Sequence, residues 1–363
     1  MSEGFLLSRL LLRFDAAHDL LLNNLSAVAL TPDGNLWLGA DEGTGIERFS
    51  PVEPSVFGQH QHFELGNFIP LKNQDEEIDI EGLDYCGSYL WLVGSHSLKR
   101  KKPKGKNPSS DIKRLSQIKV ELNRYTLARI PVQNGELVKS FTAPKSDGQE
   151  FRAALLQTTE NGNQLIEALK TDEHLGLLIS NPLPSKENGL DIEGLAVDKN
   201  KIFLGLRGPV LRGFAIILEL EVEEKQPGVL TLKKIGEKGK LYRKHFFQLK
   251  GLGIRELCLQ GEDLIILAGP TMDLSGTLRV YRWKKALTQS NDTITYFNSD
   301  SLEILFDIPV LLDTDKAEGL ALFKSLGQQG LLVVYDSPNP TRILSEREVF
   351  ADIFHLSREE QGK

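Results

Sequence analysis

The sequence predicts an all-β protein, a β-propeller, from two observations. The tripeptide Glu-Gly-Leu occurs three times, beginning at Glu81, Glu193 and Glu318. Each copy opens a run of alternating apolar residues that leads through a turn into a second apolar run, which is typical of a β-hairpin. Repeats of roughly 40 to 60 residues with about four strands each are the signature of propeller blades.

Two degenerate copies extend the repeat, with Ser26 and Arg255 at the position of the glutamate. The interval is 55 residues from Ser26 to Glu81, 62 from Glu193 to Arg255 and 63 from Arg255 to Glu318. The interval from Glu81 to Glu193 is 112 residues, which either hides a sixth blade or contains an insertion. We favour five blades, with six as the alternative.

The favoured insertion is helical. Residues 150–170 carry apolar side chains among good helix formers and show no period-2 run, so we expect a helical insertion near 149–172. We therefore expect one propeller domain over residues 1–363, with the insertion spanning 144–190. The expected blades start near residues 25, 80, 192, 254 and 317.

The two ends of the chain are expected to complete one blade. A Phe-Asp pair at 14–15 precedes Ser26 by 12 residues, and a second pair at 306–307 precedes Glu318 by the same distance. The N-terminal segment therefore resembles the outer strand that ends a blade, and we expect it to close the last one. Such closure protects sheet edges. The last blade's own segment Arg347–Phe354 looks helical.

Bulk composition limits the function classes. The 43 basic and 50 acidic residues give a net charge of −7, which argues against a general nucleic-acid binder. The two cysteines, Cys86 and Cys258, cannot form a disulfide framework and are interpreted as core residues. The sequence contains no uninterrupted apolar stretch of about 18 residues, so it predicts no membrane span. The N-terminus lacks the pattern of a signal peptide, so we expect a cytoplasmic protein.

Blade geometry brings residues that are distant in the sequence to one place. The start of each innermost strand and the end of the next strand lie at the same mouth of the central channel. From the innermost strands this mouth is expected to receive Ser26, Glu81, Glu193, Arg255 and Glu318. From the second strands it is expected to receive Asp41, Glu42, Ser95, His96, Arg207, Pro270, Thr271, Tyr335 and Asp336.

Several carboxylates around a channel suit a hard cation, so we expect bound calcium or magnesium. The expected ligands are Glu81, Glu193, Glu318 and Asp41. Arg207 and Arg255 are expected to hold a small anionic ligand beside the cation.

This arrangement favours metal-assisted hydrolysis of an ester or phosphoester, in which His96 or Asp336 moves protons. In a second interpretation the glutamates bond to a neighbouring blade, Gly allows close chain approach, and Arg255 forms a buried structural ion pair. The protein is then a non-catalytic scaffold for binding or for a protein partner. The sequence leaves open whether it is an enzyme.

A basic segment, Lys99–Lys106, leaves the same mouth. One interpretation is a lid that draws anionic ligands, with Lys99 and Arg100 as binding residues. The other is a solvated loop. The segment contains no aromatic residue, so it offers no support for base stacking or nucleic-acid binding.

Longer strings around the repeats resemble a known family, domain of unknown function 3616. The strings are 186–195, 204–211, 251–255, 268–271 and 96–100. This resemblance covers nearly the whole chain and implies a β-propeller without an established activity. The Glu-Gly-Leu strand is also distantly similar to esterase-like phytase and lactonase-type propellers, which implies that an acid at this strand position binds calcium.

Overall fold

A computed structural model describes residues 5–16, 19–74, 76–142, 148–272, 276–309 and 314–356. The described chain is built mainly of strands, as predicted. Each Glu-Gly-Leu copy and each degenerate copy lies in the first strand of a four-stranded antiparallel sheet. These innermost strands are β2 (Leu25–Leu30), β6 (Ile80–Cys86), β17 (Asp191–Asp198), β22 (Gly253–Gln260) and β27 (Lys316–Ser325).

Each sheet continues outward in antiparallel steps. The strands after β2 are β3 (Leu36–Ala40), β4 (Gly45–Glu53) and β5 (Val56–Glu64). Those after β6 are β7 (Tyr89–Gly94), β10 (Leu127–Gln133) and β14 (Ala154–Leu156). Those after β17 are β18 (Lys201–Leu211), β19 (Phe214–Gln226) and β21 (Arg243–Gln248). Those after β22 are β23 (Asp263–Gly269), β24 (Leu278–Trp283) and β26 (Leu302–Ile308). Those after β27 are β28 (Gln328–Asp336), β30 (Glu348–His355) and β1 (Leu6–Arg13).

Shorter elements decorate these sheets. The short strands are β8 (Lys99–Arg100), β9 (Ile118–Lys119), β11 (Glu136–Leu137), β12 (Ser140–Thr142), β13 (Glu150–Arg152), β15 (Thr158–Thr159), β16 (Gly162–Asn163), β20 (Val229–Leu232), β25 (Thr293–Thr295) and β29 (Ile343–Ser345). The α-helices are α1 (Asp19–Asn23), α2 (Pro108–Leu115), α3 (Gln164–Leu169) and α4 (Gly176–Ser180). The 3₁₀ turns are η1 (Leu65–Asn67), η2 (Leu122–Tyr125), η3 (Ser185–Glu187), η4 (Glu237–Gly239), η5 (Ala286–Thr288) and η6 (Pro340–Arg342). Among the described residues no helix has the length and apolarity needed to cross a membrane.

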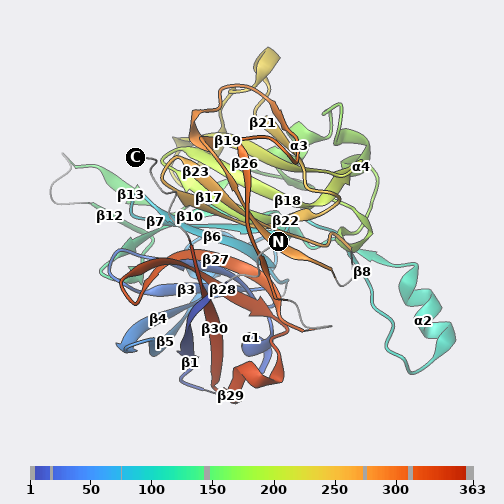
Figure 1. Ribbon diagram of the computed structural model, residues 1–363. Coiled ribbons are helices and arrows are strands. Elements are labelled where there is room, and N and C mark those ends of the chain that lie inside the picture. The colour runs from blue at the N-terminus through green and yellow to red at the C-terminus, as the bar shows by residue number, and fades with distance from the viewer. Residues whose placement is uncertain are drawn as a thin grey trace.

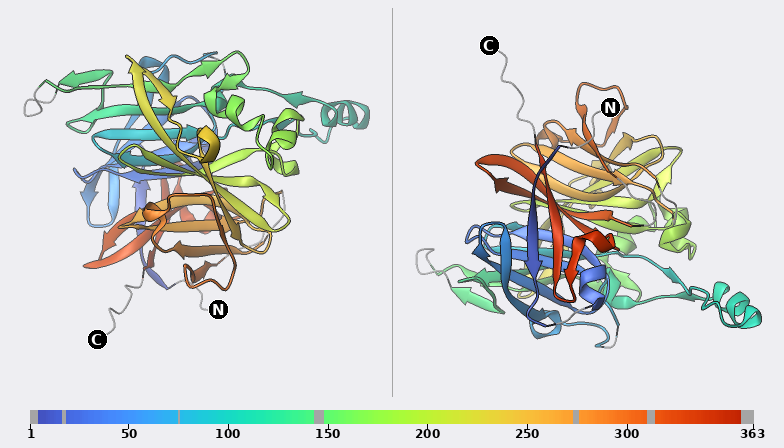
Figure 2. Two further views of the ribbon diagram at one scale, coloured as in Figure 1. Left: turned by 90° about the horizontal axis from the view of Figure 1, so that it is seen from above. Right: turned by 60° about the horizontal axis from the view of Figure 1, so that its bottom comes forward.

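The innermost strands close a ring. Each one packs against two others, in the order β2, β6, β17, β22, β27 and back to β2. Apolar side chains fill the space between neighbouring sheets. Trp37 packs between the first and second sheets, Trp91 between the second and third, and Trp283 between the third and fourth. Sheets arranged around a common axis in this way form a β-propeller, and Figures 1 and 2 show them from three directions.

The glycine of the tripeptide permits this close packing. A Cβ on Gly194 would lie 2.7 Å from Leu257 Cγ and 3.2 Å from the Leu257 backbone nitrogen on the neighbouring innermost strand. A Cβ on Gly82 would lie 2.6 Å from the Cβ of Leu195. The expectation that Gly allows close chain approach at these positions is therefore confirmed.

Of the two segments expected to be helical, one is partly strand and the other is strand throughout. Within the expected insertion near 149–172, residues 164–169 form helix α3, whereas residues 154–156 form β14 between β10 and β20. Pairing on both sides and burial override the helix propensity of this segment. Residues 143–147, at the start of the expected insertion, lie outside the described residues.

The second wrongly expected helix, Arg347–Phe354, is β30, which lies between β28 and β1. Its buried Val349, Ala351 and Ile353 follow the period of a strand. The N-terminal strand β1 pairs antiparallel with β30 from Leu6 to Arg13, as the spacing of the Phe-Asp pairs suggests.

A buried ion pair fastens the α3–α4 segment to the third sheet. The fully buried Lys244 on β21 donates from Nζ to Asp172 Oδ2 at 2.7 Å and lies 2.8 Å from His174 Nδ1. Tyr242 Oη also donates to Asp172 Oδ2, at 2.7 Å. Burial acts to raise the pKa of Asp172, but the bonds from Lys244 and Tyr242 prevail and lower the pKa to about 2.

We expect Asp172→Asn to lower the free energy of unfolding by about 3–5 kcal/mol, because the Lys244 ammonium is left buried without this carboxylate. Urea unfolding at pH 7 measures the loss. The carboxylate stabilises the fold above its ordinary pKa of 3.8, and this contribution is lost as the pH falls toward about 2, so the two proteins converge there. The control is Glu173→Gln, whose side chain is 69% exposed and which we expect to unfold like the wild type. Equal losses of unfolding free energy in the two variants would contradict the stabilising role of the buried pair between Asp172 and Lys244.

Candidate metal centre at the channel mouth

A backbone irregularity positions the repeated acid in every innermost strand. The register with the second strand slips between Ile80 and Gly82, so that Glu81 is the extra residue. The same slip leaves out one residue in each of the other innermost strands, namely Ser26, Glu193, Arg255 and Glu318. A β-bulge redirects the side chain of the extra residue out of the normal alternation. The repeat therefore encodes a ring of bulges.

The mouth of the channel opens into a cavity of about 870 Å³. Glu81, Glu193, Arg255 and Glu318 line it from the bulges, whereas Ser26 does not reach it. Second strands and the segments after them contribute Asp41, Glu42, Arg207, Pro270 and Asp336, as expected. Ser95, His96, Thr271 and Tyr335 were expected here and do not line the cavity.

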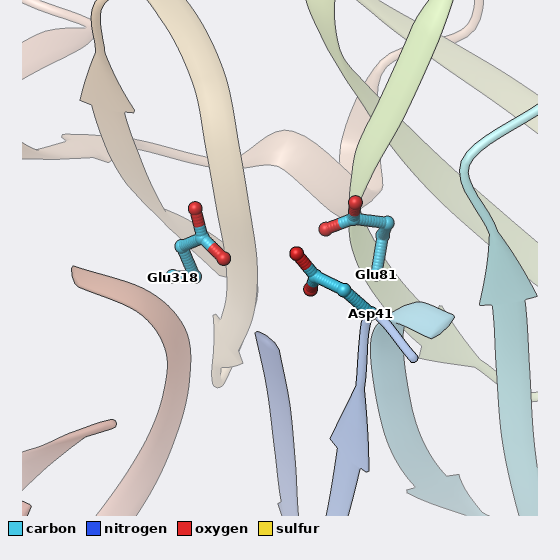
Figure 3. Close-up of side chains that lie close together, drawn as sticks. All are labelled: Asp41, Glu81 and Glu318. Atoms are coloured by element: carbon cyan, nitrogen blue, oxygen red, sulfur yellow. The ribbon is translucent and has the colours of Figure 1, made fainter. Parts of the chain in front are cut away.

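Three carboxylates from different sheets converge. One oxygen each from Asp41, Glu81 and Glu318 lies within 4.8 Å of the others. Figure 3 shows the three side chains directed toward one another. Glu81 is only 8% exposed and Glu318 only 5%. Side chains of this kind, brought together from three sheets, are the donor set of a hard cation.

These carboxylates lack the bonds that buried acids usually have. Asp41 Oδ1 and Glu318 Oε2 are buried, and neither has a hydrogen-bond partner in the described structure. The Glu81 carboxylate likewise makes no hydrogen bond or ion pair to a described residue. A buried polar group without a partner carries a large desolvation cost. The described structure gives these oxygens no bond that offsets this cost.

Burial and mutual repulsion raise the pKa of each cluster member. Burial is the main cause for Asp41, followed by the charge of Glu318. Burial followed by the charge of Asp41 raises the pKa of Glu81 well above its ordinary value. Burial raises the pKa of Glu318 to about 8, although Arg255 opposes the rise. A cation among the three would relieve this repulsion.

The opposite half of the ring is neutralised by two arginines. Arg255 bonds to Glu318, and its Nε lies 3.1 Å from Glu193 Oε2. Arg207 pairs with Asp191, and its Nη1 lies 2.5 Å from Glu193 Oε1. Glu193 therefore lies between two guanidinium groups and outside the carboxylate cluster. Of the four expected metal ligands, the structure brings together Asp41, Glu81 and Glu318.

With all of its acids ionised, the channel mouth carries a formal negative charge. Its five carboxylates, from Asp41, Glu81, Asp191, Glu193 and Glu318, face two guanidinium groups, which leaves a formal charge of −3. Most other acids of the cavity have their own cations. These pairs are Asp79 with Arg124, Asp315 with Arg342, Asp336 with Lys316 and Glu187 with Arg100. Arg124 could not be predicted as a residue of the mouth, because it follows the basic segment in η2, outside the repeat.

The expected placement of His96 at the mouth is wrong. Its ring is 1% exposed, Nδ1 donates to the Gly94 carbonyl at 2.7 Å, and Nε2 accepts from Asn163 at 2.8 Å. Its backbone is left-handed (φ 55°), which ends the alternation of β7. Burial lowers the pKa of His96 to about 4, so the ring is neutral at pH 7. Both ring nitrogens are occupied away from the cavity.

Asp336, the other expected proton-transfer residue, does line the cavity. Its Oδ2 lies 3.1 Å from Lys316 Nζ, and its Oδ1 accepts from Ser337 Oγ at 3.0 Å. The cavity wall contains no histidine among the described residues. Carboxyl groups and lysine ammonium groups are therefore the titratable groups there.

The basic segment is a folded arm, which we define as residues 99–119. It contains β8, α2 and β9 and projects from the sheets in Figures 1 and 2. Asp111 accepts from the backbone nitrogens of Lys104 and Gly105 at 2.7 and 3.0 Å. At the base, Lys99 Nζ bonds to Glu77 at 2.6 Å and Arg100 forms a two-bond pair with Glu187. Lys99 and Arg100, the two expected ligand-binding residues of this segment, are thus ion-paired.

The chain belongs to the family described as protein of unknown function DUF3616, whose model matches residues 24–352. No curated protein matches it.

Solved structures that resemble the chain do so at low sequence identity. Virginiamycin B lyase from Staphylococcus aureus is 9% identical with a TM-score of 0.37, covering 96% of this chain and 99% of the lyase. The PQQ-bound aldose sugar dehydrogenase from Streptomyces coelicolor is 13% identical with a TM-score of 0.35, covering 95% and 98%. A putative gluconolactonase is 11% identical with a TM-score of 0.37, covering 92% and 74%. TM-scores this low support no inference about activity.

We expect Arg255→Met to destabilise the metal-free protein by about 3–5 kcal/mol at pH 9, because Glu193 and Glu318 lose a buried counter-charge. The loss should be smaller at pH 6. Glu318 has a pKa of about 8, raised by burial against the opposing charge of Arg255, so its pairing energy is expressed mainly above that pH.

Urea unfolding in chelator at both pH values measures the difference. Arg212→Met, at an exposed arginine, is the control and should have little effect at either pH. A loss for Arg255→Met that is the same at pH 6 and pH 9 would contradict the assigned ion pairs.

Proposed function

We propose that the chain is a five-bladed β-propeller that binds a divalent cation, calcium or magnesium, through Asp41, Glu81 and Glu318 at one mouth of its channel. The observation that carries the proposal is a trio of converging carboxylates, two buried and one (Asp41) half-buried, that make no hydrogen bond or ion pair to the described residues except for the pair between Glu318 and Arg255. A structural ion-pair network accounts for Glu193 but not for Glu81, which forms no salt bridge with a described residue and interacts with Arg207 and Arg255 only through the field of their charges.

The proposed site is open on one side. Calcium takes six to eight oxygen ligands, and magnesium keeps several of its waters, so three carboxylates leave positions for water or a ligand oxygen. Because the three residues line the cavity, those positions face it. When bound, such a cation acidifies water and polarises carbonyl or phosphoryl oxygens.

The reaction class that fits best is hydrolysis of an ester or phosphoester in a small anionic ligand. Asp336 lines the same cavity outside the cluster and is the residue proposed to accept or return a proton. Arg255 is proposed to position Glu318, since it bonds directly to that carboxylate. Arg255 is also proposed to contact the ligand, because it lines the cavity.

We expect titration calorimetry to detect binding of Ca²⁺ or Mg²⁺ by the chelator-treated protein. Glu81→Gln should weaken the affinity by about tenfold or more, because it removes one anionic ligand. Glu42→Gln changes an exposed acid of the same cavity outside the cluster and should leave the affinity unchanged. Absence of binding by the wild-type protein, or equal effects of the two substitutions, would refute the site.

The affinity should rise from pH 6 to pH 8.5. Burial and neighbouring charges raise the pKa of Asp41 and Glu81 well above their ordinary values, and burial raises that of Glu318 to about 8. Protons therefore compete with the cation at the lower pH. Calorimetry at both values measures the change, and an affinity that is flat or falls with pH would contradict it.

The catalytic part of the proposal has its own test. Cation-dependent turnover of ester or phosphoester compounds should be abolished by Glu81→Gln. Asp336→Asn should reduce kcat while cation binding is kept. A protein that binds the cation but hydrolyses none of these compounds would instead be a non-catalytic binding propeller.

A further inference from the structure

A second charged zone faces the same cavity. Lys101, Lys102 and Lys186 line it, and all three are exposed. No side chain among the described residues bonds or ion-pairs with their ammonium groups. The other lysines and arginines of the cavity wall are paired, as shown for Lys99 and Arg100. We call these three residues the lysine wall.

One ion pair brings the lysine wall together from two segments. Arg100, at the base of the arm, donates from Nη2 to Glu187 Oε2 at 2.8 Å. The backbone nitrogen of Ser185 donates to the Leu98 carbonyl at 3.0 Å beside it. Lys186, which lies between these contacts in η3, is therefore held next to the arm.

The backbone of the two arm lysines is also fixed. Arg114 Nε donates to the Lys102 carbonyl at 2.6 Å. The backbone nitrogen of Lys101 donates to the Gln117 carbonyl at 3.1 Å. Because these bonds hold the arm in place, an anion binding the lysine wall would pay little ordering cost beyond the lysine side chains.

The cavity is therefore bipolar, with a formal charge of −3 at the carboxylate ring and +3 at the lysine wall. Its volume of about 870 Å³ is that of a small-molecule site and is far larger than one ion needs. When its acids are ionised, the carboxylate ring repels anions, and a bound cation would offset that repulsion. A ligand that satisfies both zones must carry anionic groups at two positions.

We propose that this cavity binds a phosphorylated small molecule with at least two anionic groups. One group completes the coordination of the cation at Asp41, Glu81 and Glu318, and the second is held by the lysine wall. This inference rests on the proposed cation site. Phosphate is favoured over carboxylate because lysine ammonium groups act as point charges, whereas paired recognition of carboxylate is the strength of arginine.

The arm offers a matched control. Lys104, Lys106 and Lys113 are exposed lysines of the same arm that do not line the cavity. Changing three lysines to glutamine removes the same charge in either set. A general attraction of anions to a basic arm would depend on both sets equally, whereas the proposed site depends on the lysine wall alone.

The test is equilibrium dialysis of labelled pyrophosphate and orthophosphate against the wild-type protein and the two triple variants at saturating Mg²⁺. Pyrophosphate carries two phosphoryl groups and should bind about tenfold or more tightly than orthophosphate. Lys101→Gln/Lys102→Gln/Lys186→Gln should weaken pyrophosphate binding by about tenfold or more. Lys104→Gln/Lys106→Gln/Lys113→Gln should bind it like the wild type. Equal losses in both variants, or no preference for pyrophosphate, would overturn the proposal.

Cation titration without any anion separates this inference from the proposed function. If the wild-type protein and the lysine-wall variant bind Mg²⁺ alike but pyrophosphate is not retained, the cation site stands and the ligand class is wrong. If the wild-type protein binds no cation, both fail. All the substituted lysines are exposed and form no ion pair with a described residue, so melting temperatures should stay at the wild-type value and exclude misfolding as the cause of lost binding.

Discussion

In each innermost strand the register with the second strand slips at the same place, and this β-bulge is the constraint on which the channel mouth depends. The bulge turns one side chain per sheet away from the normal alternation. The glycine that follows three of these residues lets the neighbouring strand pack within contact distance. Ring closure and the placement of charged groups thus have a common origin in three residues of sequence.

The two departures from the repeat determine how charge is distributed around the ring. Arg255 lies between Glu193 and Glu318 in the order of the strands and pairs with both. Ser26 lies between Glu318 and Glu81, and its hydroxyl donates to the Ile80 carbonyl rather than reaching the cavity. Asp41, from the next strand of the same sheet, extends toward the two glutamates (Figure 3). One side of the mouth is consequently neutralised, and the other keeps three carboxylates.

Such a distribution is unfavourable for the protein alone. The buried, mutually repelling acids have raised pKa values, and several of their oxygens lack partners among the described residues. Natural proteins keep buried groups that repel one another or lack partners mainly at functional sites. In the other half, Arg207 and Arg255 lie within ion-pair distance of Asp191 and Glu193, although Asp191 Oδ2 and Glu193 Oε2 make no hydrogen bond to a described residue either. This difference in counter-charge between the two halves of one ring is the main reason to assign binding to the Asp41 side.

The repeat made the innermost strands and the convergence of their acids predictable, because period-2 alternation and a recurring Glu-Gly-Leu specify both. Three features depended on information that the pattern lacks. The exclusion of Glu193 from the cluster depends on side-chain directions of Arg207 and Arg255. His96 is turned away from the channel mouth by its left-handed backbone just after β7. The strands β14 and β30 are formed by pairing with strands that are distant in the sequence. In β30 the apolar residues Val349, Ala351 and Ile353 do alternate as in a strand, and this pattern is visible in the sequence.

The central claim is that a cation binds among Asp41, Glu81 and Glu318 and not elsewhere in the mouth. A crystal structure of the protein grown with Mn²⁺, with anomalous diffraction recorded at the manganese absorption edge, tests it most directly. We predict one strong anomalous peak within coordinating distance of all three carboxylates, with Glu193 still paired to Arg207 and Arg255. A mouth without an anomalous peak, or a peak bound through Glu193 with the trio left apart, would contradict the account.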